Sequence, residues 1–124
     1  MPVRPTTIAR SIAIGNPTDG ERAARVVCES GGWGAAVSDE ALVRGIQILA
    51  EHAGIFTETA GGVTMAGALS LARVGRLTSS DEVVLYITGN GQKTIEAVES
   101  QVEELGPINT DLDELVEAAT ALSA

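Results

Sequence analysis

Two short turns combine glycine with side chains that can bind a ligand. Thr88-Gly89-Asn90-Gly91 places a hydroxyl before two glycines that permit a tight backbone turn. Glu58-Thr59-Ala60-Gly61-Gly62 places a carboxylate just before a predicted helix. Ligands of open α/β sheets bind at the carboxyl ends of the strands, and helix N-termini bind anions. Both segments are therefore candidate ligand-binding turns, although each pattern also fits an ordinary strand-to-helix connection.

The other reactive residue types indicate neither a catalytic nor a metal site. His52 is the single histidine and lies on the polar side of its predicted helix, without a second residue to share a metal. It also lacks the partners of a serine–histidine–aspartate triad. Cys28 is the single cysteine, which excludes an internal disulfide, and its helical position predicts a small buried hydrophobic residue. The residues alone predict two ligand-facing turns but no reaction.

Strands that alternate with helices are expected to position the two turns. Helical spacing of apolar residues predicts helices over 20–30, 39–53, 63–74, 95–105 and 112–122. Short apolar runs predict strands over 34–37, 55–58 and 83–88, the last of them apolar on both faces. This alternation predicts a three-layer α/β fold in which helices flank a small parallel sheet. We expect an irregular or extended segment over 1–18, an α/β domain fragment over 19–100 and an acidic helical tail over 101–124.

Residues at the ends of the predicted helices support their boundaries. Asp19 and Ser38 stand where an N-cap is needed, since short oxygen-bearing side chains accept hydrogen bonds from the first helical amides. Glycines that follow the last apolar residue of each helix are candidate stops. They are Gly31, Gly54 and Gly75.

Composition and charge narrow the class of partner. The 124 residues suffice for one domain, and 44% of them are hydrophobic. Eight basic and 17 acidic residues give a net charge of −9, and only three residues are aromatic, so no nucleic-acid partner is expected. Residues 95–124 hold eight acidic groups and no basic one, which indicates solvated helical faces or a docking surface for a basic partner. Without a signal peptide or a long apolar run, we expect a cytoplasmic protein with no membrane partner.

Four segments, read in order, resemble the C-terminal part of threonine synthase, a family of fold type II pyridoxal-phosphate enzymes. The segments are Thr7–Pro17, Val37–Glu40, Gly54–Thr64 and Thr88–Lys93. Each is short, but their order and spacing make the resemblance specific. It implies part of the large domain of fold type II enzymes. It also implies a lyase that uses pyridoxal phosphate to convert a small-molecule substrate, O-phosphohomoserine, and water into threonine and phosphate.

The resemblance implies roles for both turns. Thr88 would lie near the pyridine nitrogen of pyridoxal phosphate, where a neutral hydroxyl can bond that nitrogen without forcing its protonation. Glu58 would lie near the same ring, and Ala9 would offer a backbone contact near it. The wall around the ring would be shaped by Gly89, Asn90 and Gly91.

The resemblance also implies which parts of the enzyme lie elsewhere. Such enzymes bind the cofactor through a lysine and a glycine-rich phosphate loop. Lys93 is the single lysine, and it lies outside the family's cofactor-binding lysine segment. We therefore expect a C-terminal fragment without a catalytic residue, inactive alone and completed by the N-terminal part of the enzyme in cis or in trans. Alternatives are a non-catalytic module that binds a partner or self-associates as a homodimer, and a small-molecule sensor that uses the Thr88 turn.

Overall fold

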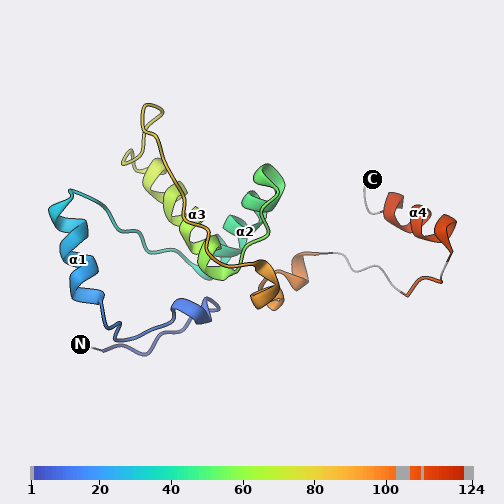
Figure 1. Ribbon diagram of the computed structural model, residues 1–124, viewed down its shortest axis with the longest axis horizontal. Helices are drawn as coiled ribbons and strands as arrows, with labels where there is room; N and C mark the ends of the chain where they lie inside the picture. Colours follow the sequence, from blue (N-terminus) through green and yellow to red (C-terminus); the bar gives the residue numbers. More distant parts are fainter. Residues whose placement is uncertain (1, 103–106, 110, 122–124) are drawn as a thin grey trace.

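Helices α2 (Asp39–Ala53) and α3 (Thr59–Arg73) form the centre of the structure (Figure 1). The computed structural model describes residues 2–102, 107–109 and 111–121. Helix α1 (Gly20–Glu29) and helix α4 (Leu112–Ala121) lie on opposite sides of the central pair. The described residues also contain three short 3-10 helices, η1 (Arg10–Ile12), η2 (Gly91–Ala97) and η3 (Glu99–Gln101).

Helix α2 begins and ends at the residues that the sequence predicts. The Ser38 hydroxyl accepts a hydrogen bond from the amide of Ala41 at 3.2 Å and so caps the first turn. Asp39 and Glu40 place negative charge in that turn, where the helix dipole favours it. Gly54 ends the helix with a φ of 65°, which glycine adopts without steric cost. The predicted cap and stop of α2 are therefore confirmed.

Two glycines let α2 and α3 pack closely. A Cβ atom at Gly62 would overlap the carbonyl oxygen of Leu42 and would lie 2.7 Å from Cγ1 of Ile46. A Cβ atom at Gly45 would overlap the carbonyl oxygen of Gly62. The backbone of each helix thus fills the space beside the glycine of the other, as close packing of an interior requires.

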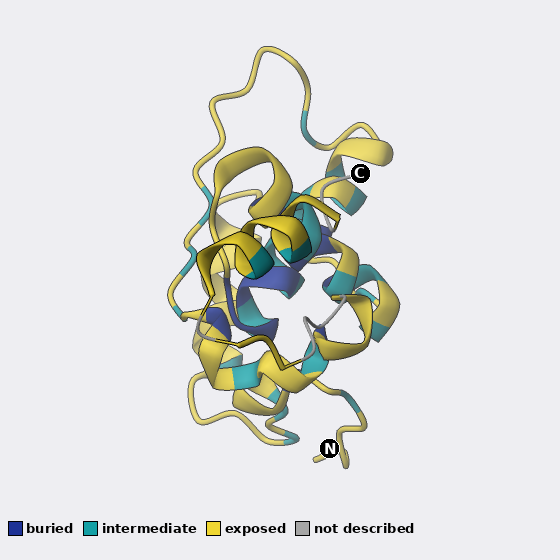
Figure 2. Ribbon diagram, turned by 90° about the vertical axis from the view of Figure 1, so that its right-hand side faces the viewer, coloured by how far each residue is buried: buried dark blue, intermediate teal, exposed yellow. Residues whose placement is uncertain are grey.

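The core is small and surrounds this helix crossing. Buried residues gather in the middle of the molecule (Figure 2). The first segment of the chain reaches this core because the Thr7 hydroxyl donates a short hydrogen bond to the Asp39 carboxylate, to which the Ile8 amide also donates, at 3.2 Å. The core cluster consists of Ala9, Leu42, Ile46 and Val98, with Val43 and Val63 packed against it.

The small parallel sheet that the sequence predicts is not seen among the described residues. Segments 34–37, 55–58 and 83–88 form no strand, and an antiparallel bridge between Thr57 and Asn90 is the single pairing in this part of the chain. A strand needs a neighbour to satisfy its amides and carbonyls. No described residue hydrogen bonds to the backbone of residues 82–88. Residues 83–88 therefore run as an extended segment rather than as a paired strand.

Two predicted helices differ from the structure in part, and a third is confirmed over its described residues. Helix α3 begins at Thr59 and not after the glycine pair, because Gly62 packs inside it against α2 and Gly61 packs against Thr57. The single helix predicted over 95–105 is replaced by η2 and η3, with a non-helical residue at Thr94, and residues 103–105 lie outside the described part. Helix α4 confirms the last predicted helix over 112–121, and residue 122 is again not described.

Helix α1 forms where the sequence predicts, but two expectations for it are wrong. Asp19 precedes the helix without a side-chain hydrogen bond to its amides, so it does not cap it. Cys28 is exposed and not buried, because no residue of α1 is buried against another described element. The apolar stripe of α1 therefore lies open to solvent in this chain.

Candidate functional site

The two candidate turns lie side by side, although about 30 residues of sequence separate them. The amide of Glu58 donates a hydrogen bond to the carbonyl of Gly89 at 3.1 Å. In return, the amide of Gly91 donates to the carbonyl of Phe56 at 3.1 Å. These reciprocal bonds make the bridge between Thr57 and Asn90 and join the start of α3 to the start of η2. The structure thus brings together the two turns that the sequence predicts to bind a ligand.

Two threonine hydroxyls reinforce this junction. The hydroxyl of Thr57, which is 1% exposed, donates to the carbonyl of Gly89 at 3.0 Å. The hydroxyl of Thr94 accepts from the amide of Thr59, the first residue of α3, at 3.1 Å. The sequence analysis missed both residues, because each bonds to a partner more than 30 residues away and belongs to no local motif.

The second turn requires glycine because a side chain there would collide with the first turn, and not because its backbone has a positive φ. A Cβ atom at Gly89 would overlap the carboxyl group of Glu58. A Cβ atom at Gly91 would lie 2.6 Å from the ring of Phe56. Neither glycine has a positive φ. The two glycines therefore let the second turn lie directly against the first one.

The Glu58 side chain is buried within this junction. It is 8% exposed, and it makes no cap bond to the amides of α3 that follow it. Buried carboxylates are normally paired with a cation or held by donors. No ion pair or side-chain hydrogen bond of Glu58 is seen within the described ranges. Its carboxylate is thus available to a donor that this part of the chain does not supply.

The other predicted site residues occupy different environments. Thr88 and Asn90 are exposed, and the Asn90 side chain caps η2 by accepting from the amide of Gln92 at 2.9 Å. Ala9 is buried in the core, and its amide and carbonyl bond to the Thr7 hydroxyl and to the amide of Ile12. The structure therefore places Thr88 and Asn90 at the junction of the turns, while Ala9 belongs to the hydrophobic core.

A buried hydroxyl marks the N-terminus of α3. The side chain of Thr59 is fully buried, and its hydroxyl is the one buried side-chain polar atom without a hydrogen-bond partner among the residues that the structure describes. Buried polar groups are nearly always satisfied, so such an atom requires an explanation. It lies next to Glu58 in the sequence and hence at the same junction.

Comparison with known proteins identifies the family. Residues 1–89 match the family of pyridoxal-phosphate dependent enzymes, and this range covers most of the chain. The chain belongs to this family. The match includes the Glu58 turn and reaches Thr88 and Gly89, so it covers both sides of the junction. Membership fits a fold type II domain and confirms pyridoxal phosphate as the cofactor of the family.

Several relatives in the family are threonine synthases. The threonine synthase of Methanocaldococcus jannaschii is 36% identical over 111 residues, which are 90% of this chain and 27% of that protein. That of a Bacillus species is 30% identical over 90% of this chain and 32% of its own length. That of Mycobacterium leprae is 31% identical over 91% of this chain and 31% of its own length. The resemblance to threonine synthase is confirmed, and the chain spans about a third or less of these relatives.

The residues of the junction fit one side of the family's cofactor. Thr88 offers an exposed neutral hydroxyl, which suits a ring nitrogen, and Thr59 leaves a buried hydroxyl without a partner. The Glu58 carboxylate has no ion pair or hydrogen bond among the described residues. A residue suited to hold the cofactor covalently is not evident there. Lys93 is exposed on η2, and its amide bonds back to the carbonyl of Asn90. The junction therefore offers a hydroxyl and backbone groups that suit one side of a pyridoxal-phosphate ring.

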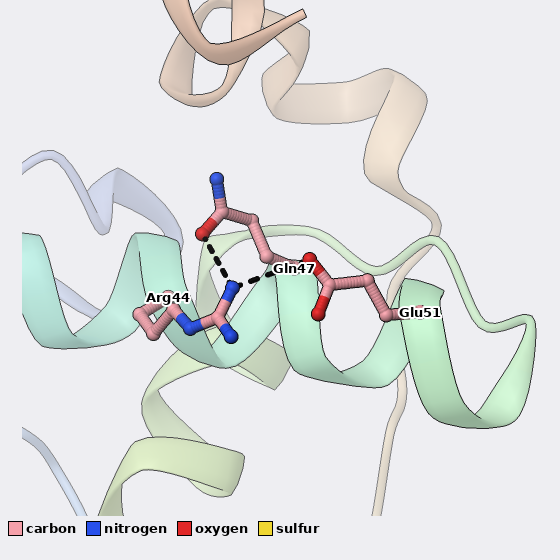
Figure 3. Close-up of polar contacts among 3 residues, drawn as sticks. All are labelled: Arg44, Gln47 and Glu51. Atoms are coloured by element: carbon pink, nitrogen blue, oxygen red, sulfur yellow. Dashed lines mark hydrogen bonds and ion pairs between the residues drawn. The ribbon is translucent and has the colours of Figure 1, made fainter. Parts of the chain in front are cut away.

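Other features of the described residues add no second site. No group of three or more metal-ligating side chains is found in the ranges that the structure describes. In the same ranges, no helix is both long and apolar enough to cross a membrane. Figure 3 shows Arg44 bonded to Gln47 and Glu51 on the outer face of α2, each at 3.2 Å. Because these side chains are about half exposed, the ion pair contributes at most about 1 kcal/mol and marks a solvated helix face.

Proposed function

We propose that this chain forms one wall of the pyridoxal-phosphate site of a threonine synthase-like enzyme and is inactive by itself. The reaction proposed for the whole enzyme converts O-phosphohomoserine and water into threonine and phosphate. The observation that carries this proposal is the hydrogen-bonded junction between Glu58 and Gly89, with Thr88 exposed at its edge. The similarity to threonine synthases over nine-tenths of the chain supports it.

Each residue of the junction has a distinct part in the proposed wall. Bound pyridoxal phosphate supplies an electron sink for charge that develops on the substrate. The Thr88 hydroxyl holds the ring nitrogen without an ion pair, so the nitrogen is not forced to carry a proton. The Glu58 carboxylate accepts a hydrogen bond from a donor near the ring. The backbone of Gly89, Asn90 and Gly91 lines the ring.

The proposed inactivity of the isolated chain rests on its single lysine. Lys93 is exposed to solvent on η2, whereas a lysine that binds the cofactor covalently needs a site that excludes water. A lysine and a phosphate loop must therefore come from the N-terminal part of the enzyme, in cis or in trans. The same part would pair with residues 83–88, in which Val84 and Tyr86 are 77% and 80% exposed, and would complete the parallel sheet.

The proposal is tested with the purified chain, pyridoxal phosphate and O-phosphohomoserine. We expect no release of phosphate above that of a Lys93→Ala control. We also expect no covalent cofactor on Lys93 after borohydride reduction, as measured by mass spectrometry of peptides. Release of phosphate, or a cofactor adduct on Lys93 that supports it, would refute the claim that the reactive lysine lies elsewhere. Addition of an N-terminal threonine synthase fragment is expected to restore activity, and Thr88→Val is expected to reduce the restored rate.

A self-associating module is the second candidate function, because apolar residues are exposed along the extended segment. Val83, Val84 and Tyr86 are each about half exposed or more, and unpaired extended backbone is a template for pairing with another chain. Light scattering at several protein concentrations separates the two functions. A homodimer that persists after the N-terminal fragment is added would favour the module, whereas a dimer that the fragment dissolves would favour the enzyme.

A further inference from the structure

The 3-10 helix that follows the candidate site is interrupted at one residue. Within η2, Thr94 has a φ of −141° and a ψ of 45°, which are not helical values. It separates the turn of residues 91–93 from the turn of residues 95–97. At this interruption the Thr94 hydroxyl reaches the amide of Thr59 at 3.1 Å. The departure from helical geometry thus coincides with a contact to α3.

This contact supplies a cap that α3 otherwise lacks. The first amides of a helix have no partner within the helix and are usually bonded by the side chain of the N-cap residue. Glu58 is the N-cap residue of α3, and its side chain makes no such bond. Thr94 bonds the first of these amides from 35 residues away. The N-terminus of α3 is therefore fixed by the segment that follows the Thr88 turn.

We propose that Thr94 is a positioning residue of the candidate site, an inference that rests on the proposed function for its effect on the cofactor. Two connections join the turns, one before and one after Glu58 in the sequence. Thr57 and the bridge hold Gly89 before the helix begins, and Thr94 holds the first amide of the helix itself. Together they fix the position of Glu58 relative to the Gly89 turn. Without Thr94, the start of α3 is free to turn about the remaining connection.

The test compares Thr94→Val, which removes the hydroxyl at nearly constant size, with Thr94→Ser, which keeps it. Thr64→Val is the matched control, because the Thr64 hydroxyl bonds within α3 to the carbonyl of Ala60 and joins no second turn. Amide hydrogen exchange at Thr59, followed by NMR in the full chain, is the first readout. We expect about fivefold faster exchange in Thr94→Val, as for the loss of one hydrogen bond, and parent rates in Thr94→Ser and Thr64→Val.

The second readout is the affinity for pyridoxine 5′-phosphate of the chain complemented by the N-terminal threonine synthase fragment. This probe has no aldehyde and so binds without reacting with a lysine. We expect Thr94→Val to weaken this affinity about fivefold and Thr94→Ser to restore it. Equal effects of Thr94→Val and Thr64→Val on exchange, or an unchanged affinity in Thr94→Val, would overturn the inference. If neither the parent nor any variant binds the probe, the proposed function fails. The exchange rates then still decide whether Thr94 positions the turns. Thr94→Ala replaces the valine variant if the latter loses its helical circular dichroism.

Discussion

The close approach of α2 and α3 predicts opposite effects for two alanine substitutions in one helix. Gly62 and Gly67 both lie inside α3, and alanine is favoured over glycine in a helix by about 1 kcal/mol. Their surroundings differ. A Cβ atom at Gly67 has the Ala35 Cβ, at 4.0 Å, as its neighbour, so Gly67→Ala should stabilise the fold by about 1 kcal/mol.

The substitution Gly62→Ala meets the backbone of α2. Its Cβ would overlap the Leu42 carbonyl oxygen and would lie 2.7 Å from Cγ1 of Ile46, several tenths of an ångström closer than ordinary contact. Overpacking costs about 1–3 kcal/mol, and the upper end applies because a helical carbonyl cannot rotate away. After the gain in helix propensity, the expected net loss is about 2 kcal/mol, so the two variants should differ by about 3 kcal/mol.

Urea denaturation followed by circular dichroism measures both free energies of unfolding by linear extrapolation. Gly45→Ala provides a second variant from the other helix, because its Cβ would overlap the carbonyl oxygen of Gly62. The reasoning would be refuted by a Gly62→Ala chain that is as stable as Gly67→Ala. Such a result would mean that the two helices do not cross at these glycines.

Three further predictions concern the turns and the caps. Gly89→Ala should destabilise the chain by about 1–3 kcal/mol, because its Cβ would displace the Glu58 carboxyl group. Glu58→Ala in the same chain should relieve part of this loss. A double-mutant cycle that shows no coupling between the two substitutions would contradict the contact. Ser38→Ala should cost about 1 kcal/mol of stability through the lost cap of α2, measured by urea denaturation, and Ser38→Thr should cost less. Hydrogen bonds from the Thr78 amide and hydroxyl lower the pKa of Asp81. They therefore stabilise the folded chain above the ordinary aspartate pKa, and this stabilisation is lost as the pH falls through the lowered pKa. Thr78→Val should therefore raise the pKa of Asp81 in an NMR titration, and an unchanged pKa would show that the hydroxyl does not contribute.

The sequence predicts an element well where its signals are local. The extent of α2 follows from a serine before it, acidic residues in its first turn and a glycine after it, all of which act within a few residues. The start of α3 could not be predicted in this way. The pair Gly61-Gly62 reads as a helix boundary, yet Gly62 lies inside α3 because it contacts α2, a partner outside any sequence window.

The candidate site shows the same difference between local signals, which the sequence reveals, and contacts between distant segments, which it does not. Glycine-containing motifs pointed to the Glu58 and Thr88 turns, because those residues are adjacent in sequence. The hydroxyls of Thr57 and Thr94 form the cross-connections, and their partners are 32 and 35 residues away. No periodicity or spacing within one segment carries that information. A pairing between segments can be inferred from sequence only after the fold has placed them together.

The unpaired segment 83–88 determines which part of the site this chain fixes by itself. Gly89 is held by the Glu58 amide and the Thr57 hydroxyl, whereas the backbone of residues 82–88 has no hydrogen-bond partner among the described residues. Thr88 therefore lies at the boundary between a fixed turn and an unsupported segment. Because a neighbouring strand would supply hydrogen bonds to this backbone, we expect such pairing to fix the direction of the Thr88 hydroxyl. Under the proposed function, affinity for the cofactor ring is then a joint property of this chain and its N-terminal partner, even though every residue of the proposed wall belongs to this chain.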